Sequence, residues 1–114
     1  MSGIKIGAWA VKQNNRLAGN ITIKNCYITD CYTDCIIASS CTYDNLLIEN
    51  CVLKDAGRNG ITDNAINDTV RNCYFRNNGR RTAPFWQYLT ESERIDHYNT
   101  KIIENCIFDS SEKE

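Results

Sequence analysis

Three aspartates and one arginine of this 114-residue sequence could support acid–base chemistry. Asp34, Asp55 and Asp63 lie in turn-like segments, and Arg58 stands between the last two. Hydrolysis of a glycosidic bond uses two carboxylates about 5–10 Å apart, one of them with a raised pKa. Asp55, Asp63 and Arg58 are therefore candidate catalytic residues. The alternative is that these side chains only form turns, in which Asp is common.

Aromatic and basic side chains gather in residues 80–98, which also contain the only Pro and the only His of the sequence. Trp86 and Tyr88 could stack on a sugar ring, while Arg81 and His97 could pair with an anionic group of the same ligand. These four side chains are candidate ligand-binding residues. The alternative is that the aromatic rings pack against the rest of the domain and the charges are solvated.

An internal repeat indicates which elements position these residues. One unit consists of an aliphatic residue, a charged residue, Asn, Cys and two apolar residues. A weaker unit that ends in Ile occurs at residues 2–4, 34–36 and 59–61. Short alternating segments that repeat roughly every 20–25 residues are typical of a solenoid of β-coils. The four copies of the main unit are residues 23–28, 48–53, 70–75 and 103–108.

Strand alternation assigns each position of the main unit to the inside or the outside of the solenoid. The first aliphatic residue, the Cys and the last apolar residue point inward and form three interior rows. The Asn forms a corner, where its side chain can bond the backbone or the Asn of the next coil. The charged position points outward and alternates in sign from coil to coil, which favours parallel stacking. Its residues are Lys24, Glu49, Arg71 and Glu104.

The repeat is interrupted once, by an insertion at residues 80–98 that takes the place of an expected strand. Thr90 and Glu93 have the spacing of a capping box, which predicts a short helix over residues 91–97. Insertions on a solenoid often decorate its binding face. The insertion is therefore the expected place for a ligand.

The Asn corners, the spacing of the units and the Gly-Ile strand starts resemble right-handed parallel β-helix proteins of the pectate-lyase-like superfamily. The resemblance covers residues 3–79 and 99–109. It implies an all-β fold, a right-handed parallel β-helix (solenoid) of about four coils with three sheets and one insertion containing a short helix. The superfamily includes polysaccharide lyases, glycoside hydrolases and bacteriophage tailspikes, so the resemblance implies an architecture and not one activity.

Four of the seven Cys belong to the main unit, and we expect them to form an interior stack of free thiols. A linear stack lacks the tetrahedral convergence of a metal site, and parallel side chains suit disulfide geometry poorly. We therefore expect no metal and no cofactor. Free thiols favour a phage virion or the cytoplasm over an extracellular location. The four thiols are those of Cys26, Cys51, Cys73 and Cys106.

The composition excludes several classes of protein. The 13 Lys and Arg against 14 Asp and Glu give a net charge of −1, without the basic footprint of a nucleic-acid binder. No apolar run reaches the ~18–20 residues that cross a bilayer, and the first residues do not begin a signal peptide. We expect neither a nucleic-acid partner nor a membrane partner.

The outward position in the last strand of each unit is apolar or aromatic in all four copies. A continuous apolar stripe favours packing against another subunit, and tailspike-like β-helices are commonly trimers. We therefore predict a homo-oligomer, a trimer, that associates through this stripe. The alternative is the ordinary β-propensity of a half-exposed sheet. The stripe consists of Tyr27, Val52, Tyr74 and Ile107.

Residues 1–114 are expected to form a single β-helix domain, and open strand edges at both ends favour a fragment of a longer β-helix. The sequence leaves two functions open. The first is a carbohydrate-binding or structural segment of a phage tailspike-like or cell-surface protein that recognises a polysaccharide or glycan. The second is a polysaccharide lyase or glycoside hydrolase segment that uses carboxylates on the first-sheet face.

Overall fold

The structure is a computed structural model that describes residues 2–6, 19–38, 44–63, 68–79, 95–97 and 101–109. These residues form β-strands joined by turns, and none of them is helical. All strand pairs are parallel and belong to three sheets of four strands. The all-β solenoid predicted from the repeat is therefore confirmed.

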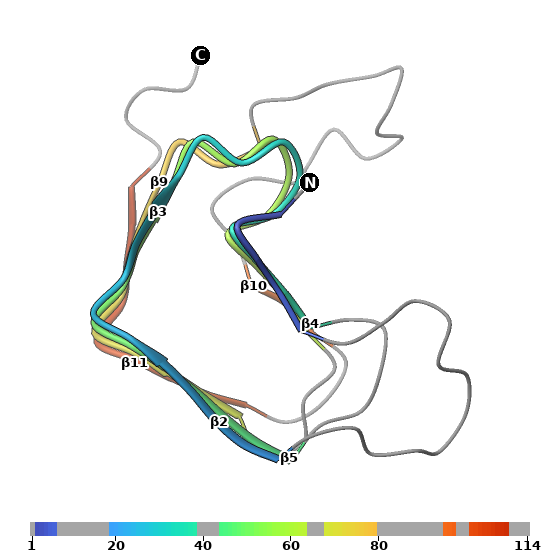
Figure 1. The fold of residues 1–114 in the computed structure, drawn as a ribbon. Coiled ribbons are helices and arrows are strands. Elements are labelled where there is room, and N and C mark those ends of the chain that lie inside the picture. The colour runs from blue at the N-terminus through green and yellow to red at the C-terminus, as the bar shows by residue number, and fades with distance from the viewer. Residues whose placement is uncertain are drawn as a thin grey trace.

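Each coil contributes one strand to each of the three sheets, so that the sheets form the sides of a stack seen end-on in Figure 1. The first sheet contains, in order, β1 (Ile4–Lys5), β4 (Ile36–Ala38), β7 (Ile61–Asp63) and β10 (Ile95–His97). The second contains β2 (Gly19–Lys24), β5 (Asp44–Glu49), β8 (Asp68–Arg71) and β11 (Lys101–Glu104). The third contains β3 (Tyr27–Thr29), β6 (Val52–Lys54), β9 (Tyr74–Arg76) and β12 (Ile107–Asp109).

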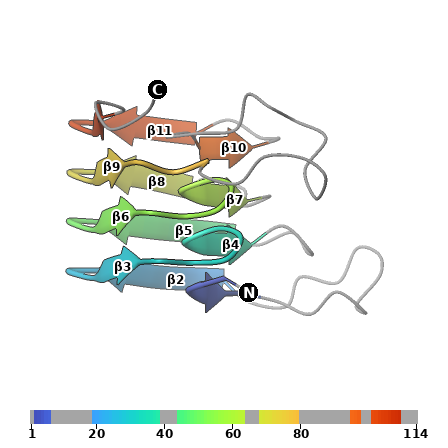
Figure 2. The ribbon, with the colours of Figure 1, turned by 90° about the horizontal axis from the view of Figure 1, so that it is seen from above.

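The coils are stacked in sequence order, from β1, β2 and β3 at one end to β10, β11 and β12 at the other (Figure 2). Equivalent positions of the repeat are register partners. Ile23, Ile48 and Val70 follow one another in the second sheet, and Leu53 pairs with Phe75 in the third. The stacking predicted from the repeat is therefore confirmed, because equivalent residues of neighbouring coils are paired in these sheets.

The interior rows are closed in the middle coils and open in the last one. Ile48, Leu53 and Phe75 are fully buried. In the fourth coil, Ile103 and Phe108 occupy the same rows and are 42% and 45% exposed. Their expected burial is wrong because, among the described residues, β11 and β12 are the last strands of their sheets and no further strand is stacked on them.

Asn residues turn the chain between the second and third sheets. Asn25, Asn50, Asn72 and Asn105 have φ of 58°, 54°, 54° and 51°. Asn visits this left-handed region at lower cost than other residues with a side chain. The Nδ2 atom of Asn50 donates to Oδ1 of Asn25 at 3.4 Å. The predicted Asn corner is confirmed, and the predicted ladder is present between these two coils.

The expected helix over residues 91–97 is wrong for its last three residues. Residues 95–97 form β10, which pairs in parallel with β7, while residues 91–94 lie outside the described residues. A capping box stabilises a helix end by local contacts only. The open edge of β7 offers a ladder of backbone hydrogen bonds instead, and this long-range pairing continues the first sheet.

Candidate functional site

A second row of left-handed residues lies where the chain leaves the third sheet. Asp30, Asp55 and Asn77 have φ of 58°, 56° and 52°. They are successive members of one corner because Thr29, Lys54 and Arg76, the residues before them, are register partners. The sequence signal for this row was an Asp or Asn four residues after each of the first three Cys of the repeat. It was missed because the row mixes two residue types.

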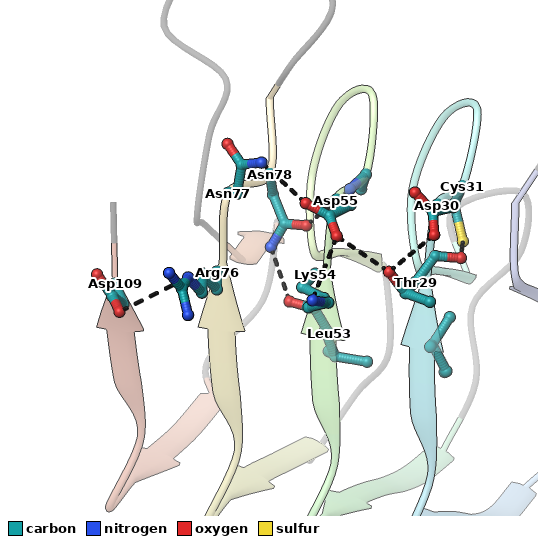
Figure 3. Close-up of polar contacts among 12 residues, drawn as sticks. Thr29, Asp30, Cys31, Leu53, Lys54, Asp55, Arg76, Asn77, Asn78 and Asp109 are labelled. Atoms are coloured by element: carbon teal, nitrogen blue, oxygen red, sulfur yellow. Dashed lines mark hydrogen bonds and ion pairs between the residues drawn. The ribbon is translucent and has the colours of Figure 1, made fainter. Parts of the chain in front are cut away.

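Asp55, a candidate catalytic residue, is the centre of this corner (Figure 3). Its Oδ2 accepts a hydrogen bond from Oγ1 of Thr29 at 3.1 Å, and its Oδ1 accepts one from Nδ2 of Asn77 at 2.8 Å. The Nζ atom of Lys54 lies 3.6 Å from Oδ2. The carboxylate therefore joins three consecutive coils, which is a structural role.

Arg58, the second candidate catalytic residue, forms an ion pair with the fully buried Asp34 of the preceding coil. Its Nε donates to Oδ1 of Asp34 at 2.9 Å, and its Nη2 donates to Oδ2. The backbone N–H of Asn59 donates to the same Oδ1 at 3.0 Å. A bidentate pair with an added backbone donor satisfies the buried carboxylate. Arg58 thus fixes the turn between the third and first sheets.

The third candidate, Asp63, ends β7 and lies in register between Ala38 of β4 and His97 of β10. The stacking therefore places one candidate catalytic residue and one candidate ligand-binding residue at neighbouring positions of the first sheet. The side chains of Asp63 and His97 are outside the described part of the structure. Arg81, Trp86 and Tyr88 also lie outside the described residues.

The outward face of the third sheet carries two parallel rows of side chains. The first row is the stripe predicted from the sequence, in which Tyr27 and Ile107 are 62% and 60% exposed. The second row was not singled out from the sequence, because its residue types share no chemical character. It consists of Thr29, Lys54, Arg76 and Asp109.

The two rows contact each other through charged and aromatic groups. The Nζ atom of Lys54 lies over the ring of Tyr27, 5.8 Å from its centroid. Contact with the Tyr27 phenol, together with Asp55, raises the pKa of Lys54 above its usual value, so this side chain stays cationic. The hydroxyl of Tyr74 donates to Oδ2 of Asp109 at 2.6 Å, which raises the pKa of Tyr74. This face thus presents aromatic rings beside cations and hydrogen-bond acceptors.

The comparison with known families agrees with this architecture. The family model described as the right handed beta helix region matches residues 10–114. The chain belongs to this family of right-handed β-helices. No curated protein and no solved structure matches the chain. The family description of this β-helix names a fold and no activity, so the function must be argued from the residues.

The cysteine row of this β-helix has a regular geometry. Each thiol donates to the backbone carbonyl two residues earlier, at 3.3 Å for Cys26, Cys51 and Cys73 and at 3.4 Å for Cys106. All four are free thiols, as predicted, and the two in the middle coils are buried. Contact with Cys51, together with burial, raises the pKa of Cys73. The same contact lowers the pKa of Cys51, so only the Cys73 thiol of this pair is made a poor nucleophile.

Burial also raises the pKa of Cys35, a fully buried thiol of the first sheet's turn. Among the residues that the structure describes, no three His, Cys, Asp or Glu side chains are grouped in a way that could hold a metal ion. In the same part of the chain, no helix has the length and apolar character needed to cross a membrane. The outward face of the third sheet is therefore the best-defined candidate site.

Proposed function

We propose that this β-helix segment binds an acidic polysaccharide on the outward face of its third sheet, as part of a phage tailspike-like or cell-surface protein. The observation that carries the proposal is the exposed ring of Tyr27 with the cation of Lys54 above it. An aromatic ring can hold the apolar face of a sugar, and a neighbouring cation can pair with its carboxylate.

The stacking of the coils supports a ligand that runs along the helix axis. Register partners in neighbouring coils are about 4.8 Å apart, a step comparable with the length of one sugar unit. Tyr27 and Tyr74 lie two coils apart in one row, and Lys54 and Arg76 lie in consecutive coils of the other. A linear chain on this face would meet an aromatic ring at alternate sugars and a cation at two successive ones.

The proposal is tested by titrating the protein with polygalacturonate in a calorimeter, with neutral dextran of similar size as the control ligand. Tyr27→Ala and Arg76→Ala should each weaken binding about tenfold, which corresponds to about 1.4 kcal/mol. Arg71→Ala is the matched control, because Arg71 belongs to the same coil as Arg76 but lies on the second sheet. Equal binding of the two polysaccharides, or equal loss in the control variant, would contradict the proposal.

The predicted trimer uses the same row of side chains and therefore competes with this proposal. Tyr27 and Tyr74 cannot hold a polysaccharide while they are covered by another subunit. Light scattering on the isolated chain separates the two. A trimer that fails to bind polygalacturonate, and that Tyr27→Ala converts to a monomer, would favour the subunit interface instead.

Cleavage of a polysaccharide is the second candidate function, and one observation favours it. Asp63 and His97 are register partners in neighbouring strands of the first sheet. A carboxylate and an imidazole brought to adjacent positions are suited to acid–base chemistry. Release of reducing ends or unsaturated products from polygalacturonate, abolished in Asp63→Asn with folding intact, would support cleavage. Binding without any product would leave binding as the function.

A further inference from the structure

The cysteine row brings the thiols of Cys51 and Cys73 together in the second and third coils. The residues after them, Val52 and Tyr74, are register partners, and the N–H of Tyr74 donates to the carbonyl of Cys51 at 2.9 Å. Both cysteines are 2% exposed, and their thiols contact each other. Each of these two coils has another coil stacked on both of its sides (Figure 2). The pair therefore lies within the closed part of the stack.

The two sulfur atoms have the same surroundings. Each thiol lies 3.3 Å from the carbonyl oxygen two residues before it. Each also lies near a carbonyl oxygen of the preceding coil, at 3.7 Å from that of Ile23 for Cys51 and at 3.8 Å from that of Ile48 for Cys73. Because these contacts repeat from coil to coil, the sulfur atoms are offset by about one coil spacing, about 4.8 Å.

This spacing suits a cation held in a straight line between two sulfur atoms. A bond between a metal and a thiolate is about 2.3 Å long, so a linear bridge of two such bonds spans about 4.6 Å. A disulfide instead requires sulfur atoms about 2.05 Å apart. Linear binding by two thiolates is characteristic of soft cations with a filled d shell, such as Cu(I). Such a site needs two ligands, fewer than the three or more side chains whose grouping is absent from the described residues.

Loss of the two thiol protons leaves neither of the nearest backbone carbonyls without a hydrogen bond. The carbonyls of Glu49 and Arg71, to which these S–H groups donate at 3.3 Å, also accept backbone N–H groups at 3.1 and 3.2 Å. When the cation binds, two S–H bonds break, two metal–sulfur bonds form, and both protons pass to solvent. The cation enters as Cu(I), so the step transfers no electrons.

The surroundings of the pair also suit a bound cation. Both cysteines belong to the hydrophobic core, which excludes water that would compete for the metal. A bis-thiolate of Cu(I) carries one negative charge, and the S–H of Cys26, which contacts Cys51, can donate to it. Each Cys of the pair follows an exposed corner residue, Asn50 or Asn72. The sulfur atoms are therefore one residue away from solvent, from which a cation can enter.

We propose that Cys51 and Cys73 bind one soft cation of the Cu(I) type as a linear bridge between the second and third coils. The expectation of no metal rested on the tetrahedral geometry of zinc sites, which a row of thiols does not provide, whereas two thiols of a row do provide a linear site. The bridge joins two coils through interior side chains, so the bound cation also stabilises the fold. This site is separate from polysaccharide binding, which uses the outward face of the third sheet.

The test is an anaerobic titration of the reduced protein with Cu(I) in competition with a coloured Cu(I) chelator. The double variant Cys51→Ala/Cys73→Ala should bind one equivalent of copper fewer than the original chain, its affinity at this site falling by more than about a hundredfold. Cys26→Ala/Cys106→Ala is the matched control, because it removes two thiols of the same row and leaves the proposed pair. It should keep that equivalent. Zn(II), which prefers four ligands, should not distinguish the two variants.

NMR and X-ray absorption on the original chain test the site without any variant. One equivalent of Cu(I) should shift the backbone amide signals of Val52 and Tyr74 and leave those of Ile36–Ala38, beside the other buried thiol, in place. X-ray absorption should count two sulfur neighbours around the copper. Three sulfur neighbours, or shifts confined to Ile36–Ala38, would overturn the proposal. So would full copper binding by Cys51→Ala/Cys73→Ala, or an equal loss in the control variant.

Discussion

Asn and Asp residues make the corners of this β-helix. In the described residues, all nine non-glycine positions with positive φ are Asn or Asp. Their short polar side chains tolerate the left-handed conformation, and they also reach the next coil. Asn45 donates to Asn20 at 3.0 Å, and Asn77 donates to Asp55 at 2.8 Å. These short polar side chains therefore allow the backbone to turn, and they also connect neighbouring coils by hydrogen bonds.

Gly60 provides a test of interior packing. A Cβ atom at this position would lie 2.5 Å from Cδ2 and 2.8 Å from Cε2 of the buried ring of Phe75. Gly60→Ala should therefore lower the free energy of unfolding by about 1–3 kcal/mol through overpacking. Urea denaturation followed by circular dichroism measures the change. The cost should shrink when Gly60→Ala is combined with Phe75→Leu, and a cost unaffected by Phe75→Leu would refute the packing argument.

The buried thiol of Cys35 predicts a dependence of stability on pH. Its pKa is raised above the ordinary value of 9.0, first by burial and then by the neighbouring Cys31. The folded state therefore keeps its proton where the unfolded state has lost it. This contribution to stability is complete below pH 9 and falls as the pH rises above 9, by up to about 1.4 kcal/mol per pH unit.

Urea denaturation between pH 7 and pH 10.5 checks this dependence. Cys35→Ala should make the decline above pH 9 shallower, whatever its constant effect on packing. Cys106→Ala is the control, because Cys106 is half-buried in the last coil. An unchanged slope in Cys35→Ala would show that this thiol does not carry the dependence.

At the scale of strands and turns, the repeat in the sequence predicted most of what the structure contains. The Ile, Cys and Phe positions of the repeat predicted the three interior rows, and Lys24, Glu49, Arg71 and Glu104 are register partners as expected. These features follow from a period of two in each strand and from the identity of the coils. These features can be predicted without knowing which residues that are far apart in the sequence contact one another outside the repeat.

The features that the sequence did not predict depend on contacts between residues that are far apart in the sequence and do not belong to the repeat. The strand at Ile95–His97 follows an insertion, and only the open edge of β7 makes it a strand. The pairing of Arg58 with Asp34 joins turns of two coils, which no local pattern reveals. Arg58 was therefore expected to be catalytic, whereas the structure places it in an ion pair between two turns.

The corner between the second and third sheets is tested with Asn50, which has φ of 54°. Asn50→Ala should destabilise the protein by about 1–2 kcal/mol, because Ala tolerates this region less well than Asn and the contact with Asn25 is lost. Asn50→Gly removes the same side chain but relieves the strain, so it should cost less. Thermal unfolding of the two variants checks the order. Equal losses would mean that the contact between Asn side chains matters and the backbone conformation does not.

For the molecule as a whole, the sides of the stack carry different chemistry. The third sheet presents exposed tyrosine beside lysine and arginine, which we assign to an acidic polysaccharide. The second sheet presents the row of alternating charges Lys24, Glu49, Arg71 and Glu104, which are register partners in neighbouring coils.

The central claim is that the polysaccharide lies on the third sheet, and mapping the bound ligand by NMR tests it most directly. Oligogalacturonate should shift the backbone amide signals of Tyr27–Thr29, Val52–Lys54 and Tyr74–Arg76, and leave those of Ile21–Lys24 and Leu46–Glu49 in place. Signals that move in the first or second sheet while the third sheet stays unchanged would contradict the account. An oligosaccharide that shifts no signals would contradict it as well.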